Sequence, residues 1–208
     1  MTQQHEQLAT LQEIRSIMDR SSRFISLSGL SGVFAGLFAL VGAGAVKWYL
    51  NSRSIRYSDL YSLQLELETA LFLAVVAAFV LTGAVGAAFY FTFQNAQKVK
   101  QPIWNSQGKR LLINLCIPLG VGAIFCLVLL YHGILYLIAP AMLVFYGLAL
   151  INCSKYTFRD IRYLGFCEVV LGLISCFFIG WGLLSWTIGF GVLHIVYGAL
   201  MYHKYERA

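Results

Sequence analysis

Six apolar stretches, separated by polar or very short connections, occupy most of the 208-residue chain. Each is about 20 residues long, which is the length that an α-helix needs to cross the hydrocarbon core of a bilayer. The expected spans are about 24–47, 69–93, 111–131, 134–152, 162–180 and 183–202. The pattern predicts an all-α, polytopic membrane protein whose six transmembrane helices form three hairpins in one domain, residues 24–202.

Polar segments flank this domain at residues 1–23 and 203–208. Over residues 6–20, apolar side chains recur at helical spacing while polar ones fill the other face. They are Leu8, Leu11, Ile14 and Met18. This predicts a short amphipathic helix on the membrane surface, although a solvated helix packed against the first loop fits equally. Because no cleavable leader pattern precedes the first span, we expect that span to act as its own insertion signal.

Composition and charge fit a bilayer better than water. The chain is 59% hydrophobic and 12% charged, whereas soluble domains carry about 25% charged residues. Twelve of its 15 Lys and Arg residues fall in the terminal segments and in the second and fourth loops. This bias predicts a bacterial inner-membrane protein with both termini in the cytoplasm. The net charge of +6 sits beside apolar spans and faces lipid headgroups, so we expect no nucleic-acid partner.

Small residues form faces on the first two expected spans. These are Ser28, Gly32, Gly36, Ala39 and Ala43 on the first, and Gly83 and Ala87 on the second. Such faces let helix backbones approach closely in lipid. They serve packing within the bundle or a homo-oligomer. The lipid bilayer is the other expected partner, and the sequence leaves a small-molecule ligand unknown.

A short internal repeat joins the fourth and sixth spans. VFYGLAL (144–150) matches IVYGALM (195–201) at an offset of 51, which also pairs Cys116 with Cys167. This indicates a duplicated helical hairpin, with chance similarity between apolar helices as the alternative.

Glu168 and His194 are the candidate polar pair inside the membrane. Counting along the fifth and sixth spans places them about 9 Å and about 12 Å from the cytoplasmic face. The link between these spans is so short that the two helices must be antiparallel neighbours. A buried carboxyl normally finds a partner, so we expect Glu168 to meet His194. The pair is then either a structural hydrogen bond or a site that holds or passes a proton.

Other polar groups suggest packing. Asn114 and Asn152 lie near the cytoplasmic ends of the third and fourth spans, where they are expected to bond across the hairpin. The five cysteines form no CxxC or Cys/His cluster, so the sequence indicates neither a metal nor a cofactor, and no catalytic residue.

The GLSG segment, Gly29 to Gly32, resembles the serine motif of rhomboid-type intramembrane proteases, with Ser31 near the depth of His194. The motif stands on the first span, however, where that family has it on the fourth. No family signature surrounds His194, which leaves the protease a remote alternative.

Two further resemblances concern longer segments. LQEIRSIMDRSSRFISLSGLSGVFAG (11–36) resembles the start of small six-span membrane proteins of Bacteroidota, which carry no assigned activity. EVVLGLISCFFIGWGLLSWTIGFGVLHIVYGALM (168–201) is similar to the helical hairpins of HdeD-like acid-resistance membrane proteins, but has Gly180 and Trp181 where that family has a proline. Neither resemblance implies a catalytic residue.

The leading hypothesis is therefore a non-enzymatic inner-membrane protein with a structural, accessory or stress-related role. The alternative is a small proton-coupled transporter or permease that uses Glu168 and His194. A transporter requires a polar cavity that reaches this pair, whereas a closed bundle favours the first hypothesis.

Overall fold

The computed structural model describes residues 27–55, 67–98 and 104–207, together with His5 and Tyr57. Their regular structure is entirely helical, which confirms the all-α prediction. The long helices are α2 (Gly29–Ser52), α3 (Leu67–Lys98), α4 (Ser106–Tyr131), α5 (Ile138–Cys153), α6 (Asp160–Phe177) and α8 (His194–Tyr205). The short elements are η2 (Leu135–Leu137), η3 (Ser154–Tyr156), η4 (Ile179–Trp181), α7 (Gly182–Trp186) and the π-helix η5 (Thr187–Leu193).

Five helical segments among the described residues are long and apolar enough to cross a membrane. They are Gly29–Ser52, Glu68–Lys98, Ser106–Tyr131, Leu135–Tyr156 and Gly182–Tyr205. Helix α6 falls outside this set, and its 18 residues include Asp160, Arg162 and Glu168. The apolar helices are compatible with an integral membrane protein, while the crossing by α6 stays a prediction.

The boundaries of the first span differ from the prediction of 24–47. Residues 27 and 28 are not helical, and α2 runs from Gly29 to Ser52. Ser28 is extended (φ −100°, ψ 135°), and its hydroxyl donates to Glu206 Oε2 at 3.0 Å. The other oxygen of Glu206 accepts the Gly29 N–H. A carboxylate from the far end of the chain thus caps α2, which hydropathy cannot reveal.

Other boundaries shift by smaller amounts. The expected fifth span, 162–180, is α6 over 160–177 followed by the single turn η4. The expected sixth span, 183–202, is the continuous segment Gly182–Tyr205 formed by α7, η5 and α8. The predicted amphipathic helix at 6–20 lies outside the described residues.

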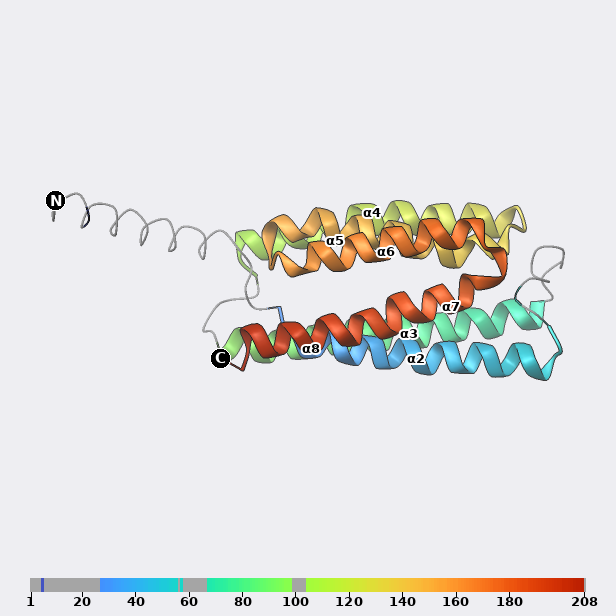
Figure 1. Ribbon diagram of the computed structural model, residues 1–208, viewed down its shortest axis with the longest axis horizontal. Helices are drawn as coiled ribbons and strands as arrows, with labels where there is room; N and C mark the ends of the chain where they lie inside the picture. Colours follow the sequence, from blue (N-terminus) through green and yellow to red (C-terminus); the bar gives the residue numbers. More distant parts are fainter. Residues whose placement is uncertain (1–4, 6–26, 56, 58–66, 99–103, 208) are drawn as a thin grey trace.

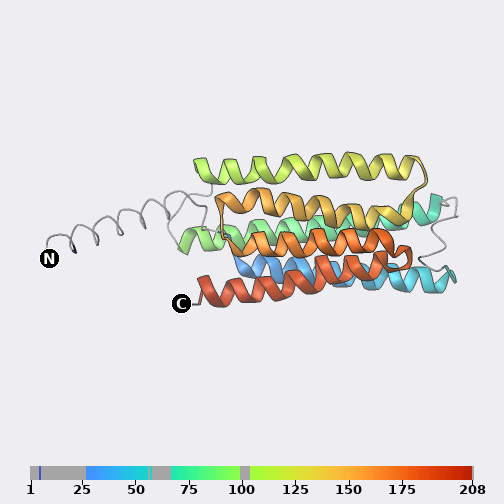
Figure 2. The same cartoon turned by 45° about the horizontal axis from the view of Figure 1, so that its top comes forward.

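The helices form two layers (Figure 1). One layer contains α4, α5 and α6, and the other contains α2, α3 and the rod α7–η5–α8. Helix α5 packs between α4 and α6, and α2 packs between α3 and α8. The layers meet where α6 contacts α8 and η5 and where α5 contacts α7. A second view shows α8 beside α2 and α4 on the opposite edge (Figure 2).

Glycines hold the tightest interfaces. A Cβ at Gly147 of α5 would lie 2.6 Å from the Gly165 carbonyl oxygen of α6, and a Cβ at Gly165 would lie 2.7 Å from that of Gly147. A Cβ at Gly198 of α8 would lie 2.6 Å from Val33 N and 2.7 Å from Gly29 O of α2. Backbone meets backbone at both interfaces, which only glycine permits.

The small-residue face of α2 packs against other helices of the same chain. A Cβ at Gly32 would lie 3.2 Å from the Gly198 Cα, and one at Gly36 would lie 2.6 Å from the Gly191 carbonyl oxygen. On α3, a Cβ at Gly83 would run into the Phe38 ring of α2, 2.6 Å from Cδ1. Of the two uses that the sequence offered for these faces, the structure shows packing within the bundle.

We predict that Gly198→Ala destabilises the protein, because the added methyl group meets the backbone of α2 and forces α8 away. Overpacking of this kind costs about 1–3 kcal/mol. Gly120→Ala on α4 is the matched control, because a Cβ there has no atom within 4 Å. Thermal unfolding of the full chain in detergent measures both, and equal melting temperatures would show that the α2–α8 contact is not tight.

Candidate functional site

Glu168 and His194 face each other where the two layers meet. Glu168 lies on α6 and is 0% exposed, and His194 is the first residue of α8 and 6% exposed. Glu168 Oε1 lies 3.4 Å from His194 Nδ1. The structure therefore brings together the two residues that depth counting placed side by side. The cause is the short turn at η4, which folds α7–η5–α8 back along α6.

Both ring nitrogens of His194 have hydrogen-bond partners. Nδ1 lies 3.0 Å from the carbonyl oxygen of Gly189, which can only accept, so Nδ1 carries a proton. Nε2 lies 2.8 Å from the hydroxyl of Tyr146 on α5, and in a neutral ring it accepts from that hydroxyl. Tyr146 was singled out in the sequence only as part of the repeat, and its place in this site is new.

The π-helix η5 shapes the site. It spans Thr187–Leu193 and ends where His194 begins. Single π-turns occur often at functional sites. A Cβ at Gly189 would run into the Glu168 carboxylate and into Leu143, so only glycine leaves room for the carboxylate here. Gly189 thus has two roles, as the acceptor for His194 and as the space for Glu168.

The carboxylate of Glu168 is buried without a hydrogen bond among the described residues. Burial of an uncompensated charge is costly, so the group is either a neutral acid or an anion opposite a protonated imidazole. Ser175, two turns further along α6, also has a buried oxygen without a partner. The inner face of α6 therefore carries polar groups that its packing does not satisfy.

The predicted asparagine bridge is present. Asn152 Nδ2 on α5 donates to the Asn114 backbone oxygen at 3.0 Å and lies 3.2 Å from Asn114 Oδ1 on α4. Asn114 Nδ2 in turn donates to the Arg110 carbonyl at 2.8 Å. These bonds tie α4 to α5 near one end of the hairpin, which is a packing role.

The structure does not join Ser31 to His194. The Ser31 hydroxyl donates to the Ser28 carbonyl at 2.5 Å, and the nitrogens of His194 contact Gly189 and Tyr146. In the part of the chain that the structure describes, no three His, Cys, Asp or Glu side chains gather as metal ligands.

No protein-family model matches the chain, and no curated protein or solved structure matches it either.

We predict that Tyr146→Phe lowers stability, because it leaves His194 Nε2 buried without a partner. An unsatisfied buried group of this kind costs about 1–3 kcal/mol. Tyr163→Phe on the same layer is the control, since Tyr163 is 60% exposed. Thermal unfolding compares the two variants. A Tyr146→Phe protein that melts with wild type would contradict the hydrogen bond.

Proposed function

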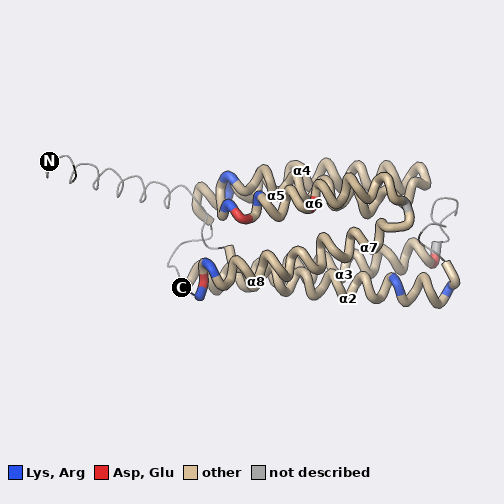
Figure 3. Tube along the Cα trace, in the orientation of Figure 1, with Lys and Arg blue, Asp and Glu red and all other residues tan. Residues whose placement is uncertain are grey.

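We propose that this chain is a non-enzymatic, multi-pass protein of a bacterial inner membrane, with six spans and both termini in the cytoplasm. The apolar helices support the membrane location. Lys and Arg residues gather mainly at the end of the bundle where the C-terminus lies, and fewer lie at the opposite end (Figure 3). By the positive-inside rule, the C-terminal end faces the cytoplasm.

We infer that Glu168 and His194 bind a proton whose gain and loss change the conformation of the bundle. The supporting observation is the fully buried Glu168 carboxyl that faces an imidazole but has no hydrogen bond among the described residues. Packing alone gives no reason to keep such a group, because an apolar side chain would fill the site at lower cost. Ionisable residues at this depth normally serve a function.

Glu168 and the Gly189 carbonyl compete for the Nδ1–H of His194, and this competition couples protonation of Glu168 to the conformation of η5. With Glu168 neutral, the Nδ1–H of His194 is bonded to the Gly189 carbonyl at 3.0 Å, as observed. When Glu168 loses its proton, the anion becomes the stronger acceptor for that N–H, and Oε1 is only 3.4 Å away. The ring then leaves Gly189, whose carbonyl belongs to η5. Because η5 packs against α2 and α6, its rearrangement reaches both layers.

A structural or accessory role is the second candidate, and the pocket geometry favours it over solute transport. A pocket of about 480 Å³ lies between α2 and α7, but neither Glu168 nor His194 is among its lining residues. This pocket gives a solute no path to the pair, so it does not support transport. A stress-related role in which pH changes only the stability of this protein would require the proton site but no pocket. The protease alternative lacks support, because Ser31 bonds to the Ser28 carbonyl and not to His194.

We predict that Glu168→Gln removes the loss of stability that ionisation of Glu168 causes as pH rises from about 5 to about 8. A buried carboxylate without a hydrogen bond is costly, so ionisation of Glu168 lowers the stability of wild type as pH rises. Gln keeps the shape of the neutral acid but cannot ionise. The measurement is the apparent melting temperature of the full chain in lipid nanodiscs as a function of pH. Because His194 is present in both proteins, the difference between their slopes reports Glu168.

Asp160→Asn is the control for this experiment. Partial burial raises the pKa of Asp160, but hydrogen bonds from Lys204 and Tyr205 outweigh it and hold the pKa below its ordinary value. Asp160 is therefore ionised throughout the tested range, and its loss should leave the slope unchanged. Parallel slopes for wild type and Glu168→Gln would refute the proton site and leave the structural role.

The orientation has its own test. A fluorescent protein that matures only in the cytoplasm should fluoresce when fused after Ala208 and stay dark when fused to a chain truncated after Gly133. Gly133 forms the tight turn between α4 and η2 with φ +71°, at the opposite end of the bundle. The reverse result would invert the proposed topology.

A further inference from the structure

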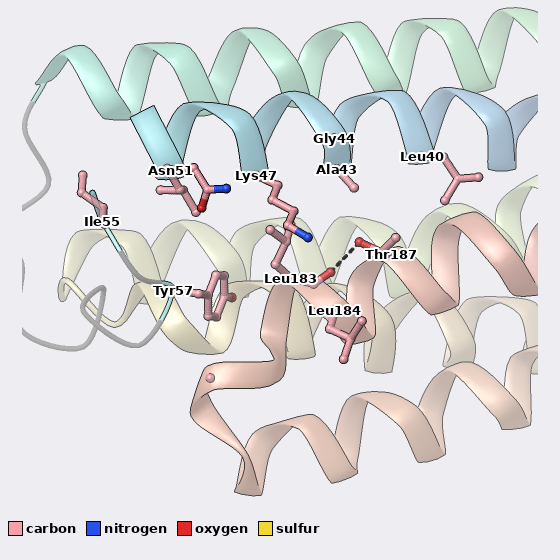
Figure 4. Close-up of a pocket in the computed structure, with 12 residues that line it drawn as sticks. Leu40, Ala43, Gly44, Lys47, Asn51, Ile55, Tyr57, Leu183, Leu184 and Thr187 are labelled. Carbon is pink, nitrogen blue, oxygen red and sulfur yellow. Dashed lines mark hydrogen bonds between the residues drawn. The ribbon is translucent and has the colours of Figure 1, made fainter. Parts of the chain in front are cut away.

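A pocket opens between α2 and the segment that follows α6, at the end of the bundle away from the C-terminus (Figure 4). Leu40 and Ala43 of α2 form one apolar wall, and Leu183 and Leu184 of α7 form the other. The volume of about 480 Å³ lies within the range of ligand pockets, about 300–1,000 Å³.

The cation of the pocket is Lys47. Its amino group points from α2 toward Leu183, into the space between the two walls (Figure 4). Lys47 makes no ion pair with a residue that the structure describes. No carboxylate of the described residues therefore competes with an anionic ligand for this charge.

The hydroxyls of the pocket are already engaged. The Thr187 hydroxyl donates to the Leu183 carbonyl at 2.7 Å, and the Tyr57 hydroxyl donates to the Tyr136 carbonyl at 3.5 Å. Burial raises the pKa of Tyr57, so its hydroxyl stays neutral. The polar side chains left for a ligand are Lys47 and the Asn51 amide, and the rest of the recognition depends on the apolar walls.

The pocket runs from a polar end into an apolar depth. Lys47 lies five residues before the end of α2, or about 7.5 Å along the axis, and Leu40 lies about 18 Å from that end. Trp48 beside Lys47 is 70% exposed, as expected for an aromatic residue at the membrane interface. The cation therefore stands at headgroup level and Leu40 at acyl-chain level.

Two glycines keep the pocket open. Ideal Cβ atoms at Gly44 and Gly180 would have no atom within 4 Å, and both residues line the pocket. Side chains could occupy this space without a clash, so it is free for a ligand.

We propose that this pocket binds one acyl chain of an anionic membrane phospholipid, with the lipid phosphate paired with Lys47 and the chain packed along Leu40, Leu183 and Leu184. A soluble anion would leave the apolar walls uncovered, whereas in a zwitterionic lipid the cation of the headgroup competes with Lys47 for the phosphate. The phospholipid matches both features at the depth at which each occurs.

Native mass spectrometry of the full chain in neutral detergent tests this proposal. Phosphatidylglycerol and phosphatidylcholine with identical acyl chains are added in turn, and the fraction of protein that carries one bound lipid is measured. We expect wild type to prefer phosphatidylglycerol about fivefold. Lys47→Gln should bring the preference close to one, and Gly44→Leu, which fills the pocket, should weaken both lipids at least about tenfold.

Matched variants distinguish lipid binding in the pocket from lipid binding elsewhere on the surface. Lys109→Gln removes a cation at the other end of the bundle, beside Trp104. Gly86→Leu adds the same side chain to α3, where a Cβ also has no atom within 4 Å. Both should bind lipid as wild type does. Unchanged binding by Gly44→Leu, equal binding of the two lipids by wild type, or tighter binding of a free fatty acid would each overturn the proposal.

Discussion

Direct contact between helix backbones at glycines fixes the arrangement of this bundle. In lipid, apolar side chains gain little by leaving acyl chains for one another, so close packing decides which helices associate. Gly147 and Gly165 bring α5 to α6, and Gly198 brings α8 to α2 at Gly29. Because α6 and α8 belong to one hairpin, these contacts also determine where the layers meet. Glu168 and His194 lie on this seam.

The two copies of the predicted internal repeat share glycine contacts but not the polar pair. Gly147 and Gly198 are equivalent in the repeat, and each makes a backbone contact with the neighbouring hairpin in the bundle. The positions equivalent to Glu168 and His194 hold Ile117, which is 60% exposed, and Leu143, which is fully buried. The polar pair is therefore not needed to form such a hairpin. Its presence in one copy alone is a reason to assign it a function of its own.

Sequence reasoning succeeded where helix geometry is constant. The fixed rise per residue and the short link placed Glu168 opposite His194, and the same logic joined Asn114 to Asn152. It failed where a distant residue or an altered helix decides the result. Glu206 sets the start of α2 from the other end of the chain. The π-turn escaped a reading based on a period of 3.6, although the glycines of TIGFGVL (187–193) were its visible signal.

The proposed proton site and the proposed lipid pocket meet on the same short segment. Thr187, the first residue of η5, lines the pocket, and Gly189, two residues later, holds His194 and accommodates the Glu168 carboxylate. A π-turn contains one more residue than an α-helical turn. Conversion of η5 to an α-helix would therefore shift the residues before it relative to those after it. Any ligand that prefers one form of η5 must therefore change the affinity for the proton, and the proton must change the affinity for the ligand by the same factor. In these two proposals, lipid binding at one end of η5 and protonation at the other act on the same helical turn.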